Sequence, residues 1–325
     1  MPADPLTAAA PTPPAVPSGV TVIIPAYNYD RYLPAAINSA LAQDYPVVEV
    51  IVVDDGSTDS TREVAARYGE RSRYVYQENA GLSAARNTGL RLATHAFVAF
   101  LDADDLWEPA MISTCMRAFA ELPGDYAVVA CPGQFVDEQN RPVATAAGPA
   151  RPPGPVAVVE LLLRNRFFAD AVVVRRAAVQ DCGGFDAALT SSEDRDLWLR
   201  LAARARIWLV PEVLVRVRQH PGSMSRNARR MQVNNAQVLR KAFRAGVVPA
   251  WRLDLRGQAW AYHHHDVAWM YHSQGADLTA CWYELVSLLR WPFFARPARL
   301  QVPPLFRLRS LRRFLWSFAT GKAPT

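Results

Sequence analysis

Short runs of β-branched residues alternate with helix-forming segments over the first third of the chain, and this alternation constrains the fold most. Strands are separated by helices, so they are expected to pair in parallel, with helices on both faces of the sheet. The pattern predicts an α/β fold whose ligands bind beyond the carboxyl ends of the strands. The strand-like runs are VTVIIP (20–25), VVEVIVV (47–53), RYVYQ (73–77) and AFVAFL (96–101).

Carboxylates follow two of these expected strands. Asp54 and Asp55 come directly after 47–53, and Asp102 and Asp104 come directly after 96–101. No glycine-rich phosphate-binding loop of the dinucleotide or P-loop type follows any of the strands. Carboxylates repel bare phosphates, so a phosphate ligand at this edge needs a bridging cation. Mg²⁺ or Mn²⁺, which takes one or two carboxylates plus ligand phosphates, fits that requirement.

Seven ordered segments extend this pattern between residues 20 and 225. They resemble the family 2 glycosyltransferases, which are inverting enzymes of the GT-A fold. The resemblance implies a mostly parallel α/β sheet sandwiched by helices and a hexosyltransferase type of activity. The segments are VTVIIPAYNYDRYL (20–33), SALAQDYP (39–46), VEVIVVDDGSTDST (48–61), ENAGLSAARNTGL (78–90), FVAFLDADDLWEP (97–109), GGFDAALTSSEDRDLWLRLA (183–202) and RVRQHPGSMS (216–225).

On the donor side, the resemblance implies a site for a nucleotide-diphosphate sugar. Pro25, Ala26 and Tyr27 would line the base and the ribose, and Asp54 or Asp55 would read the base. A carboxylate that accepts from the ring N3–H favours uracil or thymine, hence a UDP- or dTDP-sugar. The other residues implied to bind the nucleotide sugar are Asn79, Gly81, Ser83, Arg86, Asp102 and Arg218.

The resemblance also implies a metal site and a catalytic base. Asp104 would coordinate Mn²⁺ or Mg²⁺ bridging the diphosphate, with Asp102 and His220 as further ligands. Asp194 would deprotonate the acceptor hydroxyl for in-line attack on the anomeric carbon. It lies at an expected helix start, where the helix dipole favours the ionised carboxylate. The chain lacks the QxxRW signature of processive members, so one sugar is expected to be transferred.

Each of these assignments competes with a structural interpretation. Asp54, Asp55 and Asp194 could simply be turn or helix-capping residues, and His220 precedes the turn-forming Pro221-Gly222. Arg86 could be a surface ion-pair partner. Two other functions also stay open: a sugar nucleotidyltransferase, which would release pyrophosphate, and a non-catalytic scaffold that binds sugar nucleotides or membranes.

Three regions are expected along the chain: a flexible proline-rich leader at 1–19, the GT-A domain at 20–225 and a helical region at 226–325. A loop rich in Pro, Gly and Ala is expected at 133–155. Neither a basic leader nor an apolar run long enough to span a membrane is present in the sequence, and the four cysteines are widely spaced. A cytoplasmic protein is therefore expected.

The basic charge is concentrated in the last part of the chain. Residues 285–325 hold seven arginines, one lysine and no acidic residue, whereas the rest has 28 basic against 30 acidic residues. The segment 305–318 predicts an imperfect amphipathic helix, with Leu308, Phe314 and Leu315 on one face. It suits the anionic inner face of a cell membrane, where a glycan or lipid-linked acceptor of envelope polysaccharide synthesis would be found. Nucleic acid is not an expected partner, because no recognition module accompanies this cluster.

Overall fold

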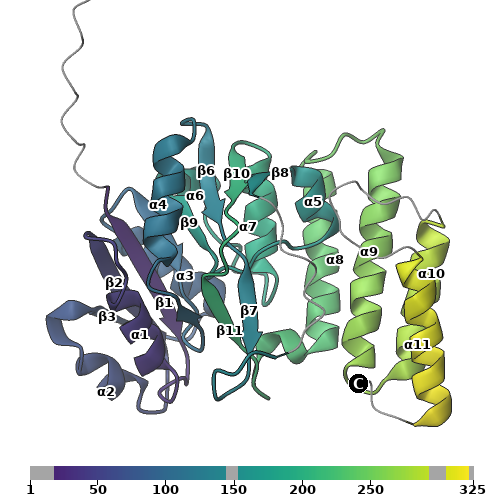
Figure 1. Ribbon diagram of the computed structural model, residues 1–325, viewed down its shortest axis with the longest axis horizontal. Coiled ribbons are helices and arrows are strands. Elements are labelled where there is room, and N and C mark those ends of the chain that lie inside the picture. Colours follow the sequence, from purple (N-terminus) through teal and green to yellow (C-terminus); the bar gives the residue numbers. More distant parts are fainter. Residues whose placement is uncertain (1–17, 144–152, 293–304, 322–325) are drawn as a thin grey trace, which may run out of the picture.

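The computed structural model describes residues 18–143, 153–292 and 305–321 (Figure 1). The expected leader at 1–19 lies almost entirely outside them, as does part of the expected loop at 133–155. A mixed sheet with the strand order β3-β2-β1-β4-β9-β6-β10-β8 forms the centre of the molecule. Its strands are β1 (Val20–Ala26), β2 (Val48–Asp55), β3 (Arg73–Gln77), β4 (Phe97–Phe100), β6 (Tyr126–Ala130), β8 (Gly154–Val156), β9 (Val172–Arg175) and β10 (Arg206–Leu209).

The first four strands of the sheet are parallel, as the alternating pattern predicts. β1 lies between β2 and β4, with Ile23 in register with both Ile51 and Phe100. Every residue of β1 is buried, because helices cover both faces of the sheet (Figure 1). The carboxyl ends of β1, β2 and β4 therefore meet at one edge, where both acidic motifs lie. Beyond β4 the sheet becomes mixed, since β9 pairs antiparallel with β4 and β6.

A second, smaller sheet lies across the same edge. Its order is β5-β11-β7, formed by β5 (Leu106–Trp107), β11 (Val215–Arg218) and β7 (Gly133–Val136). β5 begins directly after the acidic segment 102–105, and β11 pairs antiparallel with it. This pairing brings the segment after β11 to the end of β4, although more than a hundred residues separate them in sequence.

The expected loop at 133–155 is only partly a loop. β7 occupies its beginning and β8 its end, and residues 144–152 lie outside the described part of the chain. Neither strand has a strong local pattern. β7 is held by parallel pairing with β11, and β8 by antiparallel pairing with β10. Long-range pairing therefore overrides the loop-like composition.

Helices connect the strands and complete the core. Those before residue 226 are α1 (Leu33–Leu41), α2 (Thr61–Ala66), α3 (Leu82–Leu92), α4 (Met111–Glu121), α5 (Val158–Leu163), α6 (Arg176–Asp181) and α7 (Glu193–Ala202). The expected helical region at 226–325 contains α8 (Ala228–Arg244), α9 (Leu253–His272), α10 (Asp277–Arg290) and α11 (Phe306–Thr320).

The hydrophobic core continues from the sheet into α8 and α9. Leu239 of α8 and Ala259 of α9 belong to the same buried cluster as the sheet residues. A smaller cluster formed by Ala268, Ala280, Cys281 and Phe314 joins α9, α10 and α11. In the described residues, no helix is both long and apolar enough to cross a bilayer.

Helix α11 turns a partly polar face toward the bundle, which corrects the expected division of its faces. Phe314 is buried as expected, but Leu308 and Leu315 are exposed. The other buried positions of the helix are polar and find partners there. Arg307 donates to the Ser287 carbonyl at 2.9 Å, and Ser310 Oγ accepts from Trp269 Nε1 at 3.1 Å. Hydrogen bonding therefore fixes this helix as much as apolar burial does.

Close packing between α3 and β1 gives a testable prediction. An ideal Cβ on Gly89 would lie 2.3 Å from Cγ2 of the fully buried Ile23. Alanine raises helix propensity by about 1 kcal/mol over glycine, but this clash cannot relax cheaply in a packed core. We expect Gly89→Ala to lower the free energy of unfolding by about 1–3 kcal/mol in chemical denaturation.

Gly124→Ala is the matched control, because nothing lies within 4 Å of an ideal Cβ on that exposed glycine. It should leave the denaturation midpoint unchanged. Equal midpoints for the Gly89 and Gly124 variants would contradict the close packing of α3 on β1.

Candidate active site

Two loops at the carboxyl edge of the sheet are joined to each other. Asn28, which follows β1 in a left-handed conformation (φ 57°), donates its backbone N–H to Ser57 Oγ at 2.9 Å. Its side-chain oxygen accepts from the Thr58 N–H at 2.8 Å, and the Asp59 carboxylate accepts from the Asp30 N–H at 3.0 Å. These bonds hold the end of β1 against the end of β2. Of the predicted base-lining residues, Pro25 and Ala26 are buried, whereas Tyr27 is 47% exposed.

Asp54 and Asp55 are both buried, and their oxygens already accept hydrogen bonds. Asp54 accepts from the Ser57 N–H at 2.8 Å and from the Tyr74 hydroxyl at 2.7 Å. The Asp55 carboxylate accepts from Gln77 Nε2 at 2.6 Å and from the Gly81 N–H at 2.8 Å. Both residues thus organise the turns of this edge, as the structural interpretation proposes. A role in reading the base remains a prediction.

Helix α3 links the predicted nucleotide segment to the loop before α7. Asn79 and Gly81 are exposed before it, and Gly81 has the positive φ of 91° that a side chain would disfavour. Within the helix, Ser83 Oγ donates to the Leu189 carbonyl at 3.4 Å. Asn87 makes two bonds of 2.8 Å with the backbone of Phe185. The loop before α7 is therefore fixed to α3.

Arg86 forms the central ion bridge of this edge. Its guanidinium is buried and reaches the Asp102 carboxylate at 2.5 Å and the Glu193 carboxylate at 2.5 Å. One cation therefore joins the acidic segment after β4 to the first residue of α7. Burial raises the pKa of Asp102 above its usual range even though Arg86 opposes this shift. Sequence reasoning assigned no role to Glu193; its position beside Asp194 was the only available signal.

Asp104 and His220 meet as the family resemblance predicts. His220 Nε2 lies 2.9 Å from Asp104 Oδ2, brought there by the pairing of β11 with β5. The rings of Tyr29 and Tyr32 pack against the imidazole, at centroid separations of 5.9 and 5.2 Å. Burial and the charge of Asp104 raise the pKa of the Tyr29 hydroxyl, so that group stays protonated.

Arg218 is held beside this pair instead of extending into open space. Its guanidinium carbon lies 4.8 Å from the centre of the Tyr32 ring, and its Nη2 donates to Asn140 Oδ1 at 2.7 Å. The Arg218 backbone N–H donates to Asp105 Oδ1 at 2.7 Å. This bond attaches β11 to the acidic segment. A contact between the Arg218 side chain and the nucleotide sugar remains a prediction.

Asp105, the last residue of the acidic segment after β4, and Asp170, before β9, form a pair of neighbouring carboxyl groups. Asp105 and Asp170 are both buried, and burial raises the pKa of Asp170 to about 7. Burial and the neighbouring Asp170 carboxylate raise the pKa of Asp105 well above its usual range. Burial and like charge therefore favour the protonated form of these carboxyl groups. Sequence reasoning missed Asp170, because no local motif marks the residue before β9.

The side chains at this edge fit a divalent cation only if a bound phosphate ligand supplies further coordinating oxygens. Among the described residues, no three His, Cys, Asp or Glu side chains are grouped so that they could hold a metal ion. Asp104 and His220 supply one carboxylate and one imidazole, and Asp102 is engaged by Arg86. Mg²⁺ and Mn²⁺ bind well through few protein ligands plus phosphate oxygens. Asp104 and His220 therefore fit a metal that a diphosphate completes.

Asp194 lies in the first turn of α7 and is half-buried. Its carboxylate accepts from the Arg195 N–H at 2.7 Å and from Asn165 Nδ2 at 2.8 Å. Burial and the charge of Glu193 raise the pKa of Asp194 to about 6. The expected effect of the helix dipole is therefore outweighed, and the carboxylate is a stronger base than an ordinary aspartate. It remains mostly ionised at neutral pH.

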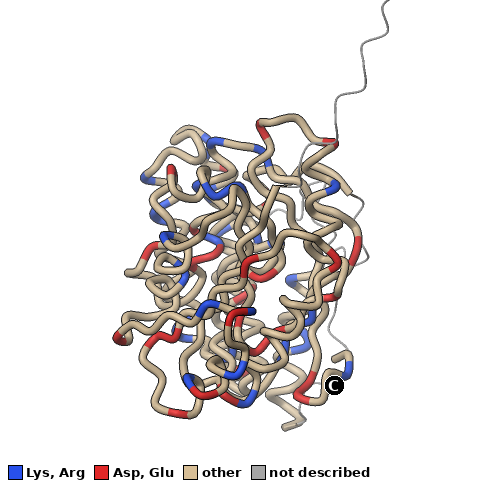
Figure 2. The backbone as a smooth tube through the Cα atoms, turned by 90° about the vertical axis from the view of Figure 1, so that its left-hand side faces the viewer, with Lys and Arg blue, Asp and Glu red and all other residues tan. Residues whose placement is uncertain are grey.

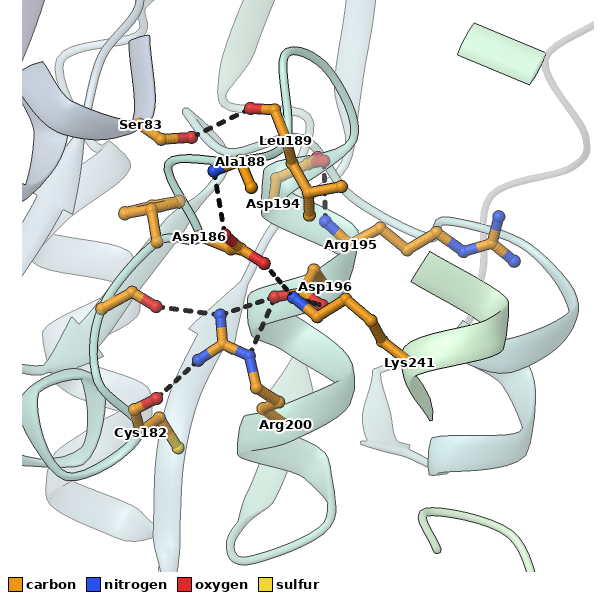
Figure 3. Close-up of polar contacts among 12 residues, drawn as sticks. Ser83, Cys182, Asp186, Ala188, Leu189, Asp194, Arg195, Asp196, Arg200 and Lys241 are labelled. Carbon is orange, nitrogen blue, oxygen red and sulfur yellow. Dashed lines mark hydrogen bonds and ion pairs between the residues drawn. The ribbon is translucent and has the colours of Figure 1, made fainter. Parts of the chain in front are cut away.

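Charged side chains hold the loop before α7 in place (Figure 3). Lys241 of α8 pairs with Asp186 of the loop and with Asp196 of α7, the latter at 2.8 Å. Arg200 pairs with Asp196 at 2.8 Å and donates to the Cys182 carbonyl at 2.6 Å. The loop that precedes Asp194 is therefore fixed from α3, α7 and α8 at once.

The mostly parallel central sheet, sandwiched by helices and with acidic segments at its carboxyl edge, has the architecture of the GT-A fold of glycosyltransferases. The chain belongs to glycosyl transferase family 2, whose model matches residues 21–186, about half of its length.

Relatives with similar sequences are also named glycosyltransferases. An uncharacterized glycosyltransferase of Rickettsia prowazekii is 30% identical over 211 residues, which cover 64% of this chain and 66% of the relative, just under two thirds. Glycosyltransferase GlyA of Streptococcus pneumoniae is 43% identical over 112 residues, which cover 34% of this chain and 16% of that protein.

Two solved structures share the fold over most of the chain. Staphylococcus aureus TarS 1–349 in complex with UDP-GlcNAc has a TM-score of 0.57 at 19% identity, covering 94% of this chain and 92% of that one. The mannosyltransferase PcManGT from Pyrobaculum calidifontis, in complex with GDP-Man and Mn²⁺, has a TM-score of 0.61 at 22% identity. The latter likeness covers 94% of this chain and 87% of that one, so it extends into the C-terminal helices.

The Arg86 bridge gives a prediction for stability. Removing one partner of a buried ion pair leaves the other charge uncompensated, at a cost of about 3–5 kcal/mol. We expect Arg86→Met to lower the free energy of unfolding by about this amount in urea denaturation. Arg91→Met on the same helix is the control: Arg91 is exposed, so its loss should change stability by less than about 0.5 kcal/mol. Equal stability of the two variants would exclude the bridge.

Proposed function

We propose that the protein is a metal-dependent, inverting glycosyltransferase. It moves one sugar from a nucleotide-diphosphate sugar, with UDP- or dTDP-sugars favoured, to a hydroxyl of a glycan or lipid-linked acceptor. The observation that carries this proposal is the Arg86 bridge, which connects Asp102 on the donor side to Glu193, the neighbour of Asp194. Donor and base are thereby held in one rigid frame, which is what in-line displacement needs.

Asp194 supplies the proton acceptor in this mechanism. As the acceptor oxygen attacks the anomeric carbon, its proton passes to the Asp194 carboxylate and the nucleoside diphosphate leaves from the opposite face. A pKa of about 6 suits a general base working near neutral pH. A single displacement inverts the anomeric configuration.

Asp104 and His220 would hold the metal at the other end of the reacting bond. When bound, a divalent cation neutralises the charge that develops on the leaving diphosphate. Arg86 neutralises the carboxylates around it, so they do not repel the donor. The carboxylates of Asp54 and Asp55 support the preference for uracil or thymine through their acceptor chemistry. Crystal structures of structural neighbours contain UDP, UDP-GlcNAc or GDP-Man. An assay of possible sugar donors for this protein should therefore include guanosine nucleotides as well.

Family membership favours glycosyl transfer over the two rival functions. A nucleotidyltransferase would release pyrophosphate and would not need Asp194. A scaffold would bind ligand without turnover, and the raised pKa of Asp194 would then serve no purpose.

An exposed apolar surface on α10 and α11 supports peripheral membrane binding. Leu278, Trp282, Leu285 and Leu289 are exposed along α10 at helical spacing. Helix α11, which packs against α10, adds exposed apolar residues and the exposed arginines 309, 312 and 313. On the side of the molecule that faces the viewer in Figure 2, by contrast, basic and acidic residues are intermixed along the backbone. We infer that the α10–α11 surface contacts an anionic bilayer carrying the acceptor.

The first functional prediction separates chemistry from binding. Asp194→Asn should keep UDP binding with Mn²⁺ in a thermal shift assay and lower kcat by about 10²–10⁴-fold. In the wild type, kcat should fall about tenfold per pH unit below pH 6, because the base must be ionised and its pKa is about 6. Asp104→Ala is the complementary variant and should lose the Mn²⁺-dependent shift. Unchanged turnover of Asp194→Asn would refute the assignment of the base.

The second prediction concerns the α10–α11 surface. Trp282→Ser combined with Trp316→Ser should weaken sedimentation with phosphatidylglycerol vesicles by more than about tenfold, because each buried aromatic contributes roughly 1.5–3 kcal/mol. Tyr76→Ser, which removes an exposed aromatic from β3, is the control and should bind like the wild type. The membrane proposal would be contradicted if the wild-type protein did not sediment with anionic vesicles.

A further inference from the structure

A cationic cavity lies beside the predicted metal end of the site. It has a volume of about 540 Å³ and opens between the turn after His220, the first turn of α8 and the last turn of α9. Arg226, Arg229 and Arg230 line it, together with Tyr271 and Gln274. No role has been assigned to it so far.

Within the described part of the chain, no acidic side chain neutralises the three arginines. All three are exposed, and across the described ranges none of them forms an ion pair. No lining residue is acidic. Three guanidinium groups around one cavity attract a multiply charged anion, and their planar donor forks match phosphate oxygens. The positive end of the α8 dipole adds to the same field.

The walls of the cavity connect both ends of the reaction site. The Gly222 N–H donates to His220 Nδ1 at 3.2 Å, while His220 Nε2 contacts Asp104. On the other side, the Ser191 hydroxyl donates to the Arg230 carbonyl at 3.5 Å. Ser191 lies three residues before Asp194. A ligand in the cavity therefore lies between the metal end and the loop that carries the base.

The cavity is built on fixed side chains. Gln274 Nε2 donates to the Arg226 carbonyl, which joins the end of α9 to the turn before α8. The Tyr271 hydroxyl donates to Gln232 Oε1 at 3.0 Å, and Asn227 caps α8 by accepting from the Arg230 N–H at 2.9 Å. The arginines thus extend from a backbone that is already ordered.

We propose that this cavity binds a phosphate group of the acceptor, so that the acceptor substrate is phosphate-bearing. The proposal rests on the proposed glycosyl transfer and adds the acceptor class to it. Two sources share this chemistry: the phosphate of a lipid-linked acceptor and the phosphate of a water-soluble glycan or polyol chain. In both cases the arginines hold the phosphate while a nearby hydroxyl faces Asp194.

Isothermal titration calorimetry on the full chain tests this proposal. Protein saturated with UDP and Mn²⁺ is titrated with glycerol 3-phosphate, with dodecyl phosphate below its micellar concentration, and with glycerol. We expect both phosphates to bind and glycerol not to bind. Tighter binding of dodecyl phosphate indicates a lipid-linked acceptor, and equal binding indicates a soluble one. Binding should weaken as salt is raised.

A charge-matched pair of variants locates the site. The triple variant Arg226→Ser, Arg229→Ser, Arg230→Ser should weaken phosphate binding by about tenfold or more. The triple variant Arg62→Ser, Arg67→Ser, Arg244→Ser removes the same charge from exposed positions on α2, directly after α2 and at the end of α8, and should bind like the wild type. Equal weakening in both variants would mean that net charge alone attracts the anion and would overturn the proposal.

Competition separates this inference from the proposed function. If UDP with Mn²⁺ displaces the phosphate probes, the cavity belongs to the donor site and the inference is wrong, while glycosyl transfer stands. The inference is also wrong if neither phosphate binds to protein that shows the UDP shift. If the protein binds no nucleotide diphosphate, the donor assignment fails instead, and phosphate binding to the nucleotide-free protein still reports on the cavity.

Discussion

The ion bridge made by Arg86 is the interaction on which the active-site edge depends. A buried guanidinium needs partners for its charge and its N–H groups, and here two carboxylates supply them, one from the segment after β4 and one from α7. The bridge therefore fixes the segment after β4 relative to the start of α7. It also offsets negative charge at the edge where the proposed function places a diphosphate. In that proposal, stability and substrate binding would depend on the same contact.

Crowding of carboxylates is the cost of this arrangement. Four carboxyl groups gather where β4 ends and β9 begins, and in water all of them would be ionised at neutral pH. They belong to Asp102, Asp104, Asp105 and Asp170. These carboxyl groups have different surroundings: Arg86 pairs with Asp102, the His220 imidazole contacts Asp104, and burial raises the pKa of both Asp105 and Asp170. In the proposed function, a cation and a diphosphate would replace the Asp104–His220 contact.

The sequence predicted the parts of this site that depend on local pattern. β1, β2 and β4 were expected within a few residues of their observed bounds, because buried parallel strands are unmistakable β-branched runs. The meeting of Asp104 with His220 followed from the family resemblance. The Arg86–Glu193 contact joins residues 107 positions apart, and no spacing rule reveals it. The same holds for β7 and β8, whose pairing partners lie far away in sequence, and for α11, whose buried polar residues depend on partners in α9 and α10.

The C-terminal helices belong to the site and not only to its surroundings. Lys241 of α8 neutralises Asp186 and Asp196, and the Arg195 guanidinium contacts Asn235 of the same helix at 3.1 Å. Without α8, the loop before Asp194 would lose its cation, and Arg195 would lose part of its buried hydrogen bonding. The loop before Asp194 would then be fixed by α3 and α7 alone. Helix α8 also begins at the cationic cavity. Under the proposed function, one helix would therefore position both the proposed base and the phosphate of the acceptor.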